Sequence, residues 1–363
     1  MYVTDKFRLR QSVGMVNQNG MVEFFRANTR EILRIKTPFS DIIQLLNLFN
    51  GQNNIDDIII QLCGNIDKSQ LIKLVNFLNQ NHILIKQNSL YPKDILDKDY
   101  RLINLLEDYF TNTKDVIESL EKIKNSTVMI VGLGAVGSMV AVYLAKTGVE
   151  NFIFVDNDNV DVSNLHRQYY FENQVNLNKS QVLSSDLKNI NPNININSIN
   201  SYLTEDFFST HDFKSLSLII NCADEPSVDM TSRIIAEYAM KNYIPHIVGG
   251  GYNLHLTLIG QSIIPFQTAC FECFNIALGE LNKIELQNVK KLHRENRKLG
   301  SFSPLSGLAS TLASLDAFKI LIGRNDLLQQ ANKRIEFNLR EHKFNTIEIT
   351  RNPNCKWCNN HES

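Results

Sequence analysis

The sequence predicts an α/β protein in which a mostly parallel sheet is preceded by a small, separate domain of strands and helices. Three observations support this fold class. Residues 127–156 run as an apolar segment, a glycine turn, a helical stretch and a second apolar segment, which is a βαβ unit. Apolar runs at 194–199 and 216–221 supply further strands. Residues 1–90 lack this alternation. The βαβ unit is typical of a Rossmann-like sheet.

The first 90 residues are expected to form one small winged-helix-like domain. Its predicted strands, which turn-forming Asn and Gly residues separate, are 7–10, 21–26, 31–35 and 82–86. Its predicted helices, which carry apolar residues at helical spacing, are 40–49, 56–62 and 68–78. Strands, then helices, then a closing strand in a unit of this size indicate the winged-helix-like arrangement.

The rest of the chain divides into a linker and one large domain. Residues 91–125 are polar with little Gly or Pro, so we expect a helical linker there. Residues 126–363 form the α/β domain. Near its end we predict a long helix at 304–322, with small residues along one side, and antiparallel strands at 335–338 and 344–349.

Composition excludes several classes of function. A chain of 363 residues is long enough for two domains, and a net charge of -1 gives no overall field to attract nucleic acid or an anionic membrane. The N-terminus has no apolar secretory segment, and no run reaches the about 18 apolar residues of a transmembrane helix. We therefore expect a cytoplasmic protein that binds neither nucleic acid nor membrane.

A glycine-rich turn marks the first candidate site. Gly132, Gly134 and Gly137 form G-x-G-x-x-G between the strand and the helix of the βαβ unit. Such glycines allow close approach of the backbone to phosphates, and the helix N-terminus then presents free N–H groups. Asp156 ends the next strand, where a carboxylate can accept hydrogen bonds from ribose hydroxyls. A nicotinamide dehydrogenase or a purely structural turn would show the same pattern.

Four of the six cysteines form two C-x-x-C pairs, Cys270 with Cys273 and Cys355 with Cys358. In a reducing cytosol such pairs indicate metal ligands more than disulfides. Four thiolates would complete a tetrahedral Zn²⁺ site and leave no open position, so the metal would be structural. A redox pair, or four buried cysteines without a ligand, are the alternatives. The two single cysteines, both expected in the core, are Cys63 and Cys222.

The run that follows Asp156 separates these interpretations. Residues 156–168 read D-N-D-N-V-D-V-S-N-L-H-R-Q. This resembles the ThiF/MoeB branch of the ubiquitin-activating superfamily, which shows D-x-D-x-V-x-x-S-N-L-x-R-Q here. A dehydrogenase has no need of this run. The resemblance covers about residues 100–360. It implies a homodimeric adenylyltransferase that uses ATP and Mg²⁺, releases pyrophosphate and commonly carries a structural zinc.

The resemblance also implies roles for single residues. Asp156 would bind the ribose beside Asp158, Asn164 and Arg167 would contact the triphosphate, Gln168 would support that loop, Lys179 would reach the phosphates, and Asp224 would hold Mg²⁺. Attack of a carboxylate on the α-phosphorus builds charge on phosphate oxygens, so cations must lie nearby. Arg167, Lys179 and Asp224 are therefore the candidate catalytic residues. Asn176 replaces the glycine usual in the turn before the lysine.

The first domain bears on the substrate. A small winged-helix-like domain ahead of such a catalytic domain resembles, by layout, the MccB-like microcin peptide adenylyltransferases. This implies a short precursor peptide that the front domain clamps, often by strand addition. Phe24, Phe25 and Ile35 are candidates for that edge, although core positions explain them more simply. The G-G-G-Y run at 249–252 would lie near the substrate's C-terminus, or would be only a tight turn.

The predicted function is ATP-dependent adenylation of the C-terminal carboxylate, or terminal amide, of a ribosomally made peptide. Residues 275–300, which the resemblance places as a crossover loop, contain no cysteine, so a thioester-forming residue is not evident. Two alternatives stay open: adenylation of a small ubiquitin-like sulfur carrier, and a non-catalytic ThiF-like partner of a cyclodehydratase. Arg101 is a candidate for an arginine inserted into a partner's ATP site. The peptide, the choice between ATP and CTP, and the final linkage stay open.

Overall fold

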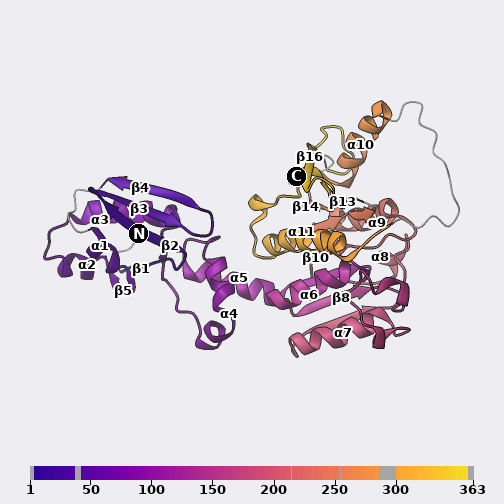
Figure 1. Ribbon diagram of the computed structural model, residues 1–363, viewed down its shortest axis with the longest axis horizontal. Helices are drawn as coiled ribbons and strands as arrows, with labels where there is room; N and C mark the ends of the chain where they lie inside the picture. Colours follow the sequence, from indigo (N-terminus) through magenta and orange to yellow (C-terminus); the bar gives the residue numbers. More distant parts are fainter. Residues whose placement is uncertain (1–3, 37–41, 214, 254, 286–299, 359–363) are drawn as a thin grey trace. The chain divides into compact units, whose positions relative to one another are not determined.

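The computed structural model describes residues 4–36, 42–213, 215–253, 255–285 and 300–358 (Figure 1). The chain forms two compact units, Met1–Glu121 and Lys122–Ser363. The domain boundaries expected from the sequence, near residues 90 and 125, stay a prediction.

In the described part of the first unit, three helices pack with two small antiparallel sheets, and two further helices lie outside them. One sheet has the order β5-β1-β6, and the other β2-β3-β4. The strands are β1 (Lys6–Leu9), β2 (Val13–Gln18), β3 (Met21–Arg26), β4 (Glu31–Lys36), β5 (Asn50–Asn54) and β6 (Leu84–Lys86), and the helices are α1 (Ile42–Asn47), α2 (Ile55–Gln61) and α3 (Lys68–Gln80). Apolar residues of the helices and strands share one core. Strands β2 and β5 were not predicted, and β5 consists only of Asn, Gly and Gln.

The outer helices of this unit are fastened to its first strand. They are α4 (Lys93–Leu106) and α5 (Thr113–Asn125), whose last residues lie beyond the unit's boundary. The buried Glu107 pairs with Arg8 and accepts a hydrogen bond from the Tyr91 hydroxyl at 2.9 Å. Arg10 donates to the carbonyl oxygen of Phe110 at 2.8 Å. These buried contacts explain why residues beyond 90 fold together with the first strands.

The second unit is built on a six-stranded sheet of order β14-β11-β10-β7-β8-β9. Its strands are β7 (Thr127–Val131), β8 (Asn151–Val155), β9 (Asn195–Ile199), β10 (Leu216–Asn221), β11 (His246–Val248) and β14 (Gln261–Ile263). All neighbouring pairs are parallel except β11 with β14. This confirms the predicted α/β class with a mostly parallel sheet, and the small front domain is compatible with the winged-helix-like prediction.

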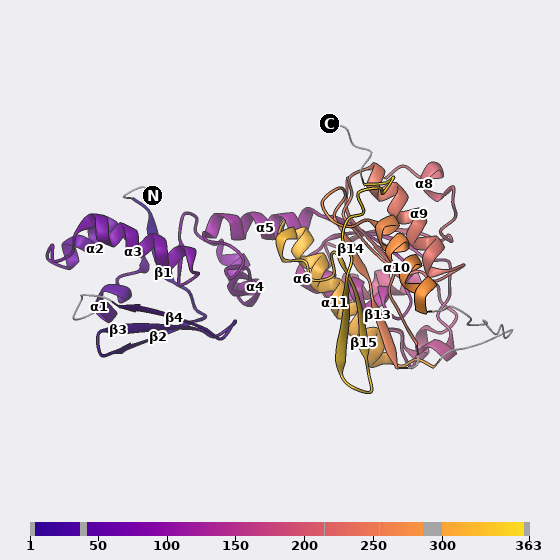
Figure 2. The same cartoon turned by 90° about the horizontal axis from the view of Figure 1, so that it is seen from above.

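Helices cover both faces of this sheet (Figures 1 and 2). The helices are α6 (Gly137–Thr147), α7 (Lys179–Ile190), α8 (Phe207–Thr210), α9 (Val228–Lys241), α10 (Phe271–Glu285) and α11 (Ser303–Leu321). On one face, α6 packs against α7 and α11. On the other, Met129 and Val131 of β7 share a core with Ile235 of α9 and Phe207 of α8. Within the described residues, no helix has both the length and the apolar character needed to span a membrane.

A second sheet follows in the order β12-β13-β15-β16. Its strands are β12 (Gly251–Asn253), β13 (Leu256–Ile259), β15 (Lys333–Asn338) and β16 (Lys343–Glu348). The antiparallel pairing predicted for the last two strands is confirmed, with Arg334 opposite Ile347. Strands β12, β13 and β14 were not predicted, because each is only three or four residues long.

The order of the parallel strands reverses between β7 and β10. The chain adds β8 and β9 on one side of β7, and β10 and β11 on the other. In open parallel sheets, ligands bind in the crevice beyond the carboxyl ends of the strands at such a reversal. Gly132, Asp156 and Asp224 follow β7, β8 and β10, so three predicted site residues converge on this edge.

Candidate functional site

The glycine turn after β7 is packed so tightly that two of its positions exclude any side chain. Gly132 has a φ of +84°, and a Cβ there would lie 2.7 Å from the backbone nitrogen of Ala223. A Cβ on Gly137 would lie 1.9 Å from the carbonyl oxygen of Gly132. At Gly134 the nearest atom would be Nε2 of Gln168 at 3.8 Å, which is an ordinary contact. The fold therefore requires glycine at 132 and 137, and close approach of a ligand at Gly134 stays a prediction.

Asp156 joins the glycine turn to the end of β8. Its carboxylate accepts hydrogen bonds from the backbone N–H of Leu133 at 2.6 Å and of Asp158 at 2.7 Å. The side chain is 9% exposed, and burial raises the pKa of Asp156, while the positive charge of Lys179 acts in the opposite direction. A carboxylate bound in this way keeps lone pairs available for a further donor, as the predicted ribose contact requires.

Lys179 is the first residue of α7 and is only 4% exposed. Its ammonium group donates to the Asp158 carboxylate at 2.7 Å, and its backbone N–H donates to the Asp158 carbonyl oxygen at 3.0 Å. The side chain of Asn178 caps the helix by accepting from the backbone of Ser180 and Gln181. The structure thus brings Asp156, Asp158 and Lys179 together, and their binding of a nucleotide stays a prediction.

Asn176 occupies the turn position at which the sequence resemblance leads one to expect glycine. Its φ is +68°, in the left-handed region that glycine adopts freely and asparagine tolerates better than most residues. Its backbone N–H donates to the carbonyl oxygen of Val160 at 2.9 Å. The turn therefore keeps its shape without glycine.

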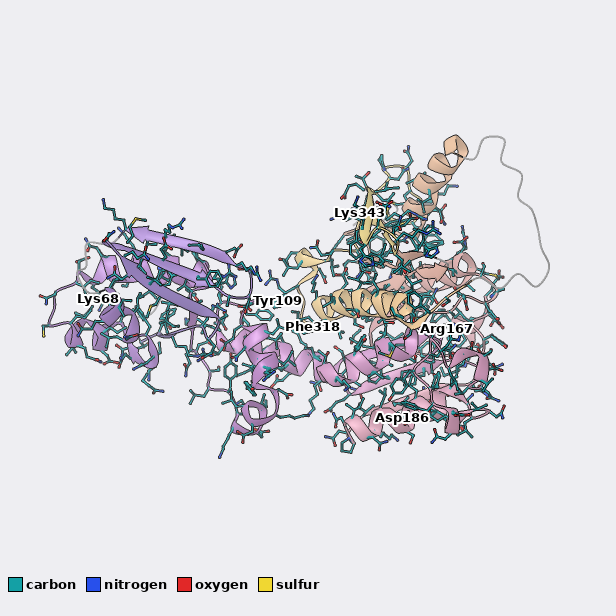
Figure 3. All side chains as sticks on the ribbon, viewed as in Figure 1. Lys68, Tyr109, Arg167, Asp186, Phe318 and Lys343 are labelled. Carbon is teal, nitrogen blue, oxygen red and sulfur yellow. The ribbon has the colours of Figure 1, made fainter. Side chains whose placement is uncertain are left out.

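Arg167 is held by its own turn and by α11. Its guanidinium group donates to Oδ1 of Asn164 at 2.6 Å and to the carbonyl oxygen of Ser163 at 3.2 Å. Ser306 of α11 donates to the Arg167 carbonyl oxygen at 3.4 Å, and Figure 3 shows Arg167 beside that helix. Within the described residues, the buried Oε1 of Gln168 has no hydrogen-bond partner. The structure thus brings together the predicted triphosphate residues Asn164 and Arg167 and the adjacent Gln168.

Asp224 lies on the loop after β10 and is exposed. That loop starts at Cys222, whose backbone N–H donates to the carbonyl oxygen of Val131 at 2.7 Å. Among the residues that the structure describes, the Asp224 carboxylate makes no hydrogen bond or ion pair with Arg167 or Lys179. The Cys222 hydrogen bond places the loop directly beside the glycine turn, and the exposed carboxylate of Asp224 is accessible for a cation.

Two groups that support the glycine turn were missed from the sequence. The buried Tyr170 donates its hydroxyl to the carbonyl oxygen of Leu133 at 2.8 Å. Ser310 of α11 donates to the carbonyl oxygen of Val136 at 3.2 Å. The small residues along α11 were noted as a pattern, but nothing in the sequence indicated that they face residues 133–136. Tyr170 follows Gln168 closely, which was the available clue.

The four paired cysteines form one buried cluster, Cys270, Cys273, Cys355 and Cys358, with all sulfur atoms within 4.8 Å of one another. The Sγ atom of Cys270 lies 3.7 Å from that of Cys273 and 3.4 Å from that of Cys355. Tetrahedral zinc with Zn–S bonds of about 2.3 Å separates its sulfur ligands by about 3.8 Å. The donor set and its spacing therefore fit one zinc ion.

The two single cysteines differ from each other. Burial raises the pKa of Cys222 to about 12, so its thiol stays protonated at neutral pH, and it borders the glycine turn rather than acting as a nucleophile. Cys63 was expected in the core, but this prediction is wrong, because the residue is exposed. It lies in the turn that ends α2, with a φ of +53°.

The remaining residues that the sequence singled out differ in burial and in backbone conformation. Phe24 is fully buried, as core packing predicted, but Phe25 on the other face of β3 is 44% exposed. Gly249 and Gly250 have φ values of +72° and +106° in the turn after β11. Arg101 is exposed on α4 and donates to the Tyr100 hydroxyl at 2.9 Å. Most of the predicted crossover loop, residues 286–299, lies outside the described residues, while α10 continues to Glu285.

Comparisons with known proteins identify relatives of this chain. The model of the ThiF family matches residues 111–357. Molybdopterin-synthase adenylyltransferase from Escherichia coli is 28% identical over 249 residues, which are 66% of this chain and 89% of that protein. Ubiquitin-like modifier-activating enzyme 5 from Gallus gallus is 25% identical over 257 residues. That match includes 66% of this chain but only 60% of the relative's own length.

Solved structures extend the similarity to the front unit. A crystal structure of Escherichia coli MccB superimposes with a TM-score of 0.77 and 23% identity, covering 98% of each chain. The Escherichia coli MccB structure with AMPCPP and MccA gives a TM-score of 0.75 at 21% identity, covering 98% of this chain and 100% of that one. At this level of identity the likeness establishes the fold. It includes the first unit, which lies mostly outside the residues that the family model matches.

Proposed function

Because this chain belongs to the ThiF family, we propose that it is a nucleotidyltransferase that uses ATP to adenylate the C-terminal carboxylate, or terminal amide, of a ribosomally made peptide. The observation that carries the proposal is the convergence of Gly132, Asp156 and Asp224 at the carboxyl ends of three adjacent strands. Lys179 lies on the same edge, paired with Asp158. An anion-binding turn, a ribose carboxylate and a nearby cation are the parts that adenylation needs.

The adenylation reaction gives each charged residue of the site a role. An oxygen of the substrate's carboxylate attacks the α-phosphorus and forms a new P–O bond, while the bond from that phosphorus to the bridging oxygen breaks and pyrophosphate leaves with the electron pair. Negative charge increases on the phosphate oxygens during this step, so Arg167 and Lys179 stabilise the transition state more than the bound substrate. Lys179 would exchange its contact with Asp158 for a phosphate oxygen.

Residues of this chain fit two metal ions. The exposed carboxylate of Asp224 would hold Mg²⁺, which prefers one or two carboxylates together with phosphate oxygens. When bound, this cation would neutralise phosphate charge. The four clustered cysteines would hold Zn²⁺ with every coordination position filled, so this ion would be structural.

The front unit favours a peptide as the substrate. Curated relatives such as the Escherichia coli molybdopterin-synthase adenylyltransferase match 66% of this chain, whereas the Escherichia coli MccB structures cover 98% of it. Several of those MccB structures contain MccA or its N-formylated form. A short precursor peptide held by the front unit and activated at the second unit is consistent with this arrangement. We also expect a homodimer, with Arg101 as a candidate for the partner's ATP site.

Adenylation of a small sulfur carrier is the second candidate. It is favoured by curated relatives that include the ThiS and molybdopterin-synthase adenylyltransferases of Escherichia coli. A non-catalytic partner of a cyclodehydratase is less favoured, because Asp156, Arg167, Lys179 and Asp224 are all retained.

Pyrophosphate release tests the choice between these candidates. The protein is incubated with Mg-ATP and, separately, with short peptides encoded beside its gene or with a β-grasp protein ending in Gly-Gly. Release that depends on a peptide supports the proposal, and the same assay with CTP defines the nucleotide. Release only with the β-grasp protein would support the sulfur-carrier alternative, and no release with any partner would contradict an enzymatic role.

A further inference from the structure

Three buried polar side chains connect the end of β10 with the turn that follows β11, next to the candidate site. Asn221 is the last residue of β10, and Thr231 and Ser232 lie in the first turns of α9. The amide nitrogen of Asn221 donates to the Thr231 hydroxyl at 3.0 Å and to the Ser232 hydroxyl at 3.1 Å. All three side chains are buried, so their hydrogen bonds are shielded from water. None of them has a role in the reaction described above.

On one side, this network fixes the backbone immediately before Asp224. Oδ1 of Asn221 accepts from the backbone N–H of Ala223 at 3.1 Å. The Thr231 hydroxyl lies 3.0 Å from the carbonyl oxygen of Ala223, its shortest acceptor distance, and 3.1 and 3.2 Å from the carbonyl oxygens of Ser227 and Val228. Both backbone groups of Ala223 therefore have a partner in the network. The same residue packs against Gly132, where an added Cβ would lie 2.7 Å from its nitrogen. The position of Asp224 is thus set relative to the glycine turn.

On the other side, the network holds the turn after β11. The Ser232 hydroxyl oxygen accepts from the backbone N–H of Gly249 at 3.0 Å. That turn is tightly packed as well, because a Cβ on Gly260 would lie 2.8 Å from the carbonyl oxygen of Gly249. Ser232 therefore connects the loop of β10 with the turn of β11 through a single oxygen atom.

The orientation expected for a bound nucleotide indicates why the link between the β10 loop and the β11 turn would matter for the reaction. Asp156, the predicted ribose ligand, lies on the β8 side of the glycine turn, and Asp224 lies on the β10 side. A nucleotide that extends from Asp156 across the glycine turn brings its phosphates toward β10. The attacking carboxylate must then approach from the side of β10 and β11, because the nucleotide occupies the other side.

We infer that Asn221, Thr231 and Ser232 are positioning residues for adenylation, which hold the Asp224 loop and the turn at 249–251 at a fixed spacing so that metal and carboxylate substrate meet the α-phosphorus correctly. This inference rests on the proposed function. The three residues act through Asp224 and Gly249 and touch none of the reacting atoms. A misplacement of about 1 Å in such a site lowers the rate by about 100-fold, so small changes in this spacing have a measurable effect.

Ser232→Ala provides the first test, because it removes one hydroxyl and leaves Gly249 without its acceptor. We expect kcat for peptide-dependent pyrophosphate release to fall by about tenfold or more and the KM for peptide to rise, while the affinity for ATP changes by less than about twofold. Amide hydrogen exchange in residues 246–253 should also become faster. Ser119→Ala is the matched control, since Ser119 is equally buried and, among the described residues, donates only to the carbonyl oxygen of Val116 in the first unit.

A pair of changes at Thr231 keeps the test decisive if Ser232→Ala does not fold. Thr231→Val removes the hydroxyl with little change of shape and should reproduce the loss of kcat, while Thr231→Ser keeps the hydroxyl and should retain activity. A kcat equal to that of the Ser119→Ala control, or equal losses in Thr231→Val and Thr231→Ser, would overturn the inference. Loss of ATP affinity in parallel with kcat would overturn it too. If the wild-type protein releases no pyrophosphate, it is the proposed function that fails, and hydrogen exchange still reports whether Ser232 holds the turn.

Discussion

At the scale of single residues, Lys179 shows how a buried cation is held at the proposed adenylation site. Its ammonium group is almost completely buried and is neutralised by Asp158, whose own side chain is half exposed. An isolated buried charge is costly, so this lysine needs a partner before a phosphate arrives. Asp158 is that partner. Because its side chain is half exposed, water can solvate the Asp158 carboxylate when the Lys179 ammonium group turns to a phosphate oxygen. The sequence predicted that both residues belong to the site, but their contact with each other is a finding of the structure.

Arg167 and Asp224 should be indispensable to the reaction. Arg167→Ala and Asp224→Ala should each reduce pyrophosphate release by at least about 100-fold, because Arg167 would place a positive charge beside the phosphates and Asp224 would hold the Mg²⁺ that does the same. The measurement is the initial rate at saturating Mg-ATP. Arg334→Ala is a suitable control, because within the part of the chain that the structure describes Arg334 pairs only with Glu336 on the same strand, β15, at 2.8 Å. Wild-type rates in both site variants would refute the assignment of these residues.

His246 should make the protein sensitive to mild acid. It is fully buried in β11, and burial lowers its pKa to about 4 from the ordinary 6.5. The unfolded chain therefore binds a proton below pH 6.5 that the folded chain refuses, so the free energy of unfolding decreases as the pH falls from 6.5 toward 4. The loss attributable to this residue is about 3 kcal/mol at most.

Denaturant unfolding at pH 7 and pH 5 measures this effect. The stability of the wild-type protein should decrease between these two values, and His246→Gln, which cannot titrate, should show a smaller decrease. An equal decrease in both proteins would show that other groups cause the acid sensitivity.

At the scale of elements, the turn between β7 and α6 shows which part of a motif is structural. The close approaches at Gly132 and Gly137 are to the protein's own backbone, so these two glycines are needed before any nucleotide binds. Gly134 meets only a side-chain nitrogen at an ordinary distance. The sequence predicted the turn and both flanking elements, because strand, glycine turn and helix are encoded locally. It could not predict that the turn packs on Ala223 and Tyr170, which come from other parts of the chain.

Gly137→Ala should damage this turn. The added methyl group would meet the carbonyl oxygen of Gly132 at 1.9 Å, so the backbone must move. We expect a lower melting temperature and at least about tenfold weaker ATP binding, measured by thermal unfolding and calorimetry. Gly307→Ala in α11 is the control, because nothing lies within 4 Å of its added Cβ and alanine favours helix. ATP binding equal to that of the control would show that the turn tolerates a side chain.

At the scale of the whole molecule, the cysteine cluster joins segments that are far apart in the sequence. Cys270 and Cys273 lie at the start of α10, and Cys355 and Cys358 lie after the last strand, yet their sulfur atoms touch. A metal there would fasten the chain beyond β16 to the core of the second unit. The pairs themselves could be read from their spacing, whereas their convergence depends on the complete fold.

Zinc content tests this interpretation. Purified protein should contain about one zinc per chain, and a strong chelator should lower its melting temperature, because metal binding contributes folding free energy. Cys358→Ser should lose the metal, while Cys63→Ser, a change at an exposed cysteine of the first unit, should retain it. Less than about half an equivalent of metal in protein purified without chelator would argue for unliganded cysteines.

The sequence by itself determined the βαβ unit, the glycine turn, the run from Asp156 to Gln168 and the two cysteine pairs. These features depend on residue type and short spacing, and short-range geometry is encoded where it occurs. Only the tertiary structure decided that Cys63 is exposed, that Tyr170 and Ser310 hold the glycine turn, and that Ser232 joins the loop of β10 to the turn of β11. These contacts join segments that are distant in sequence, so they exist only when the sheet and its helices are assembled.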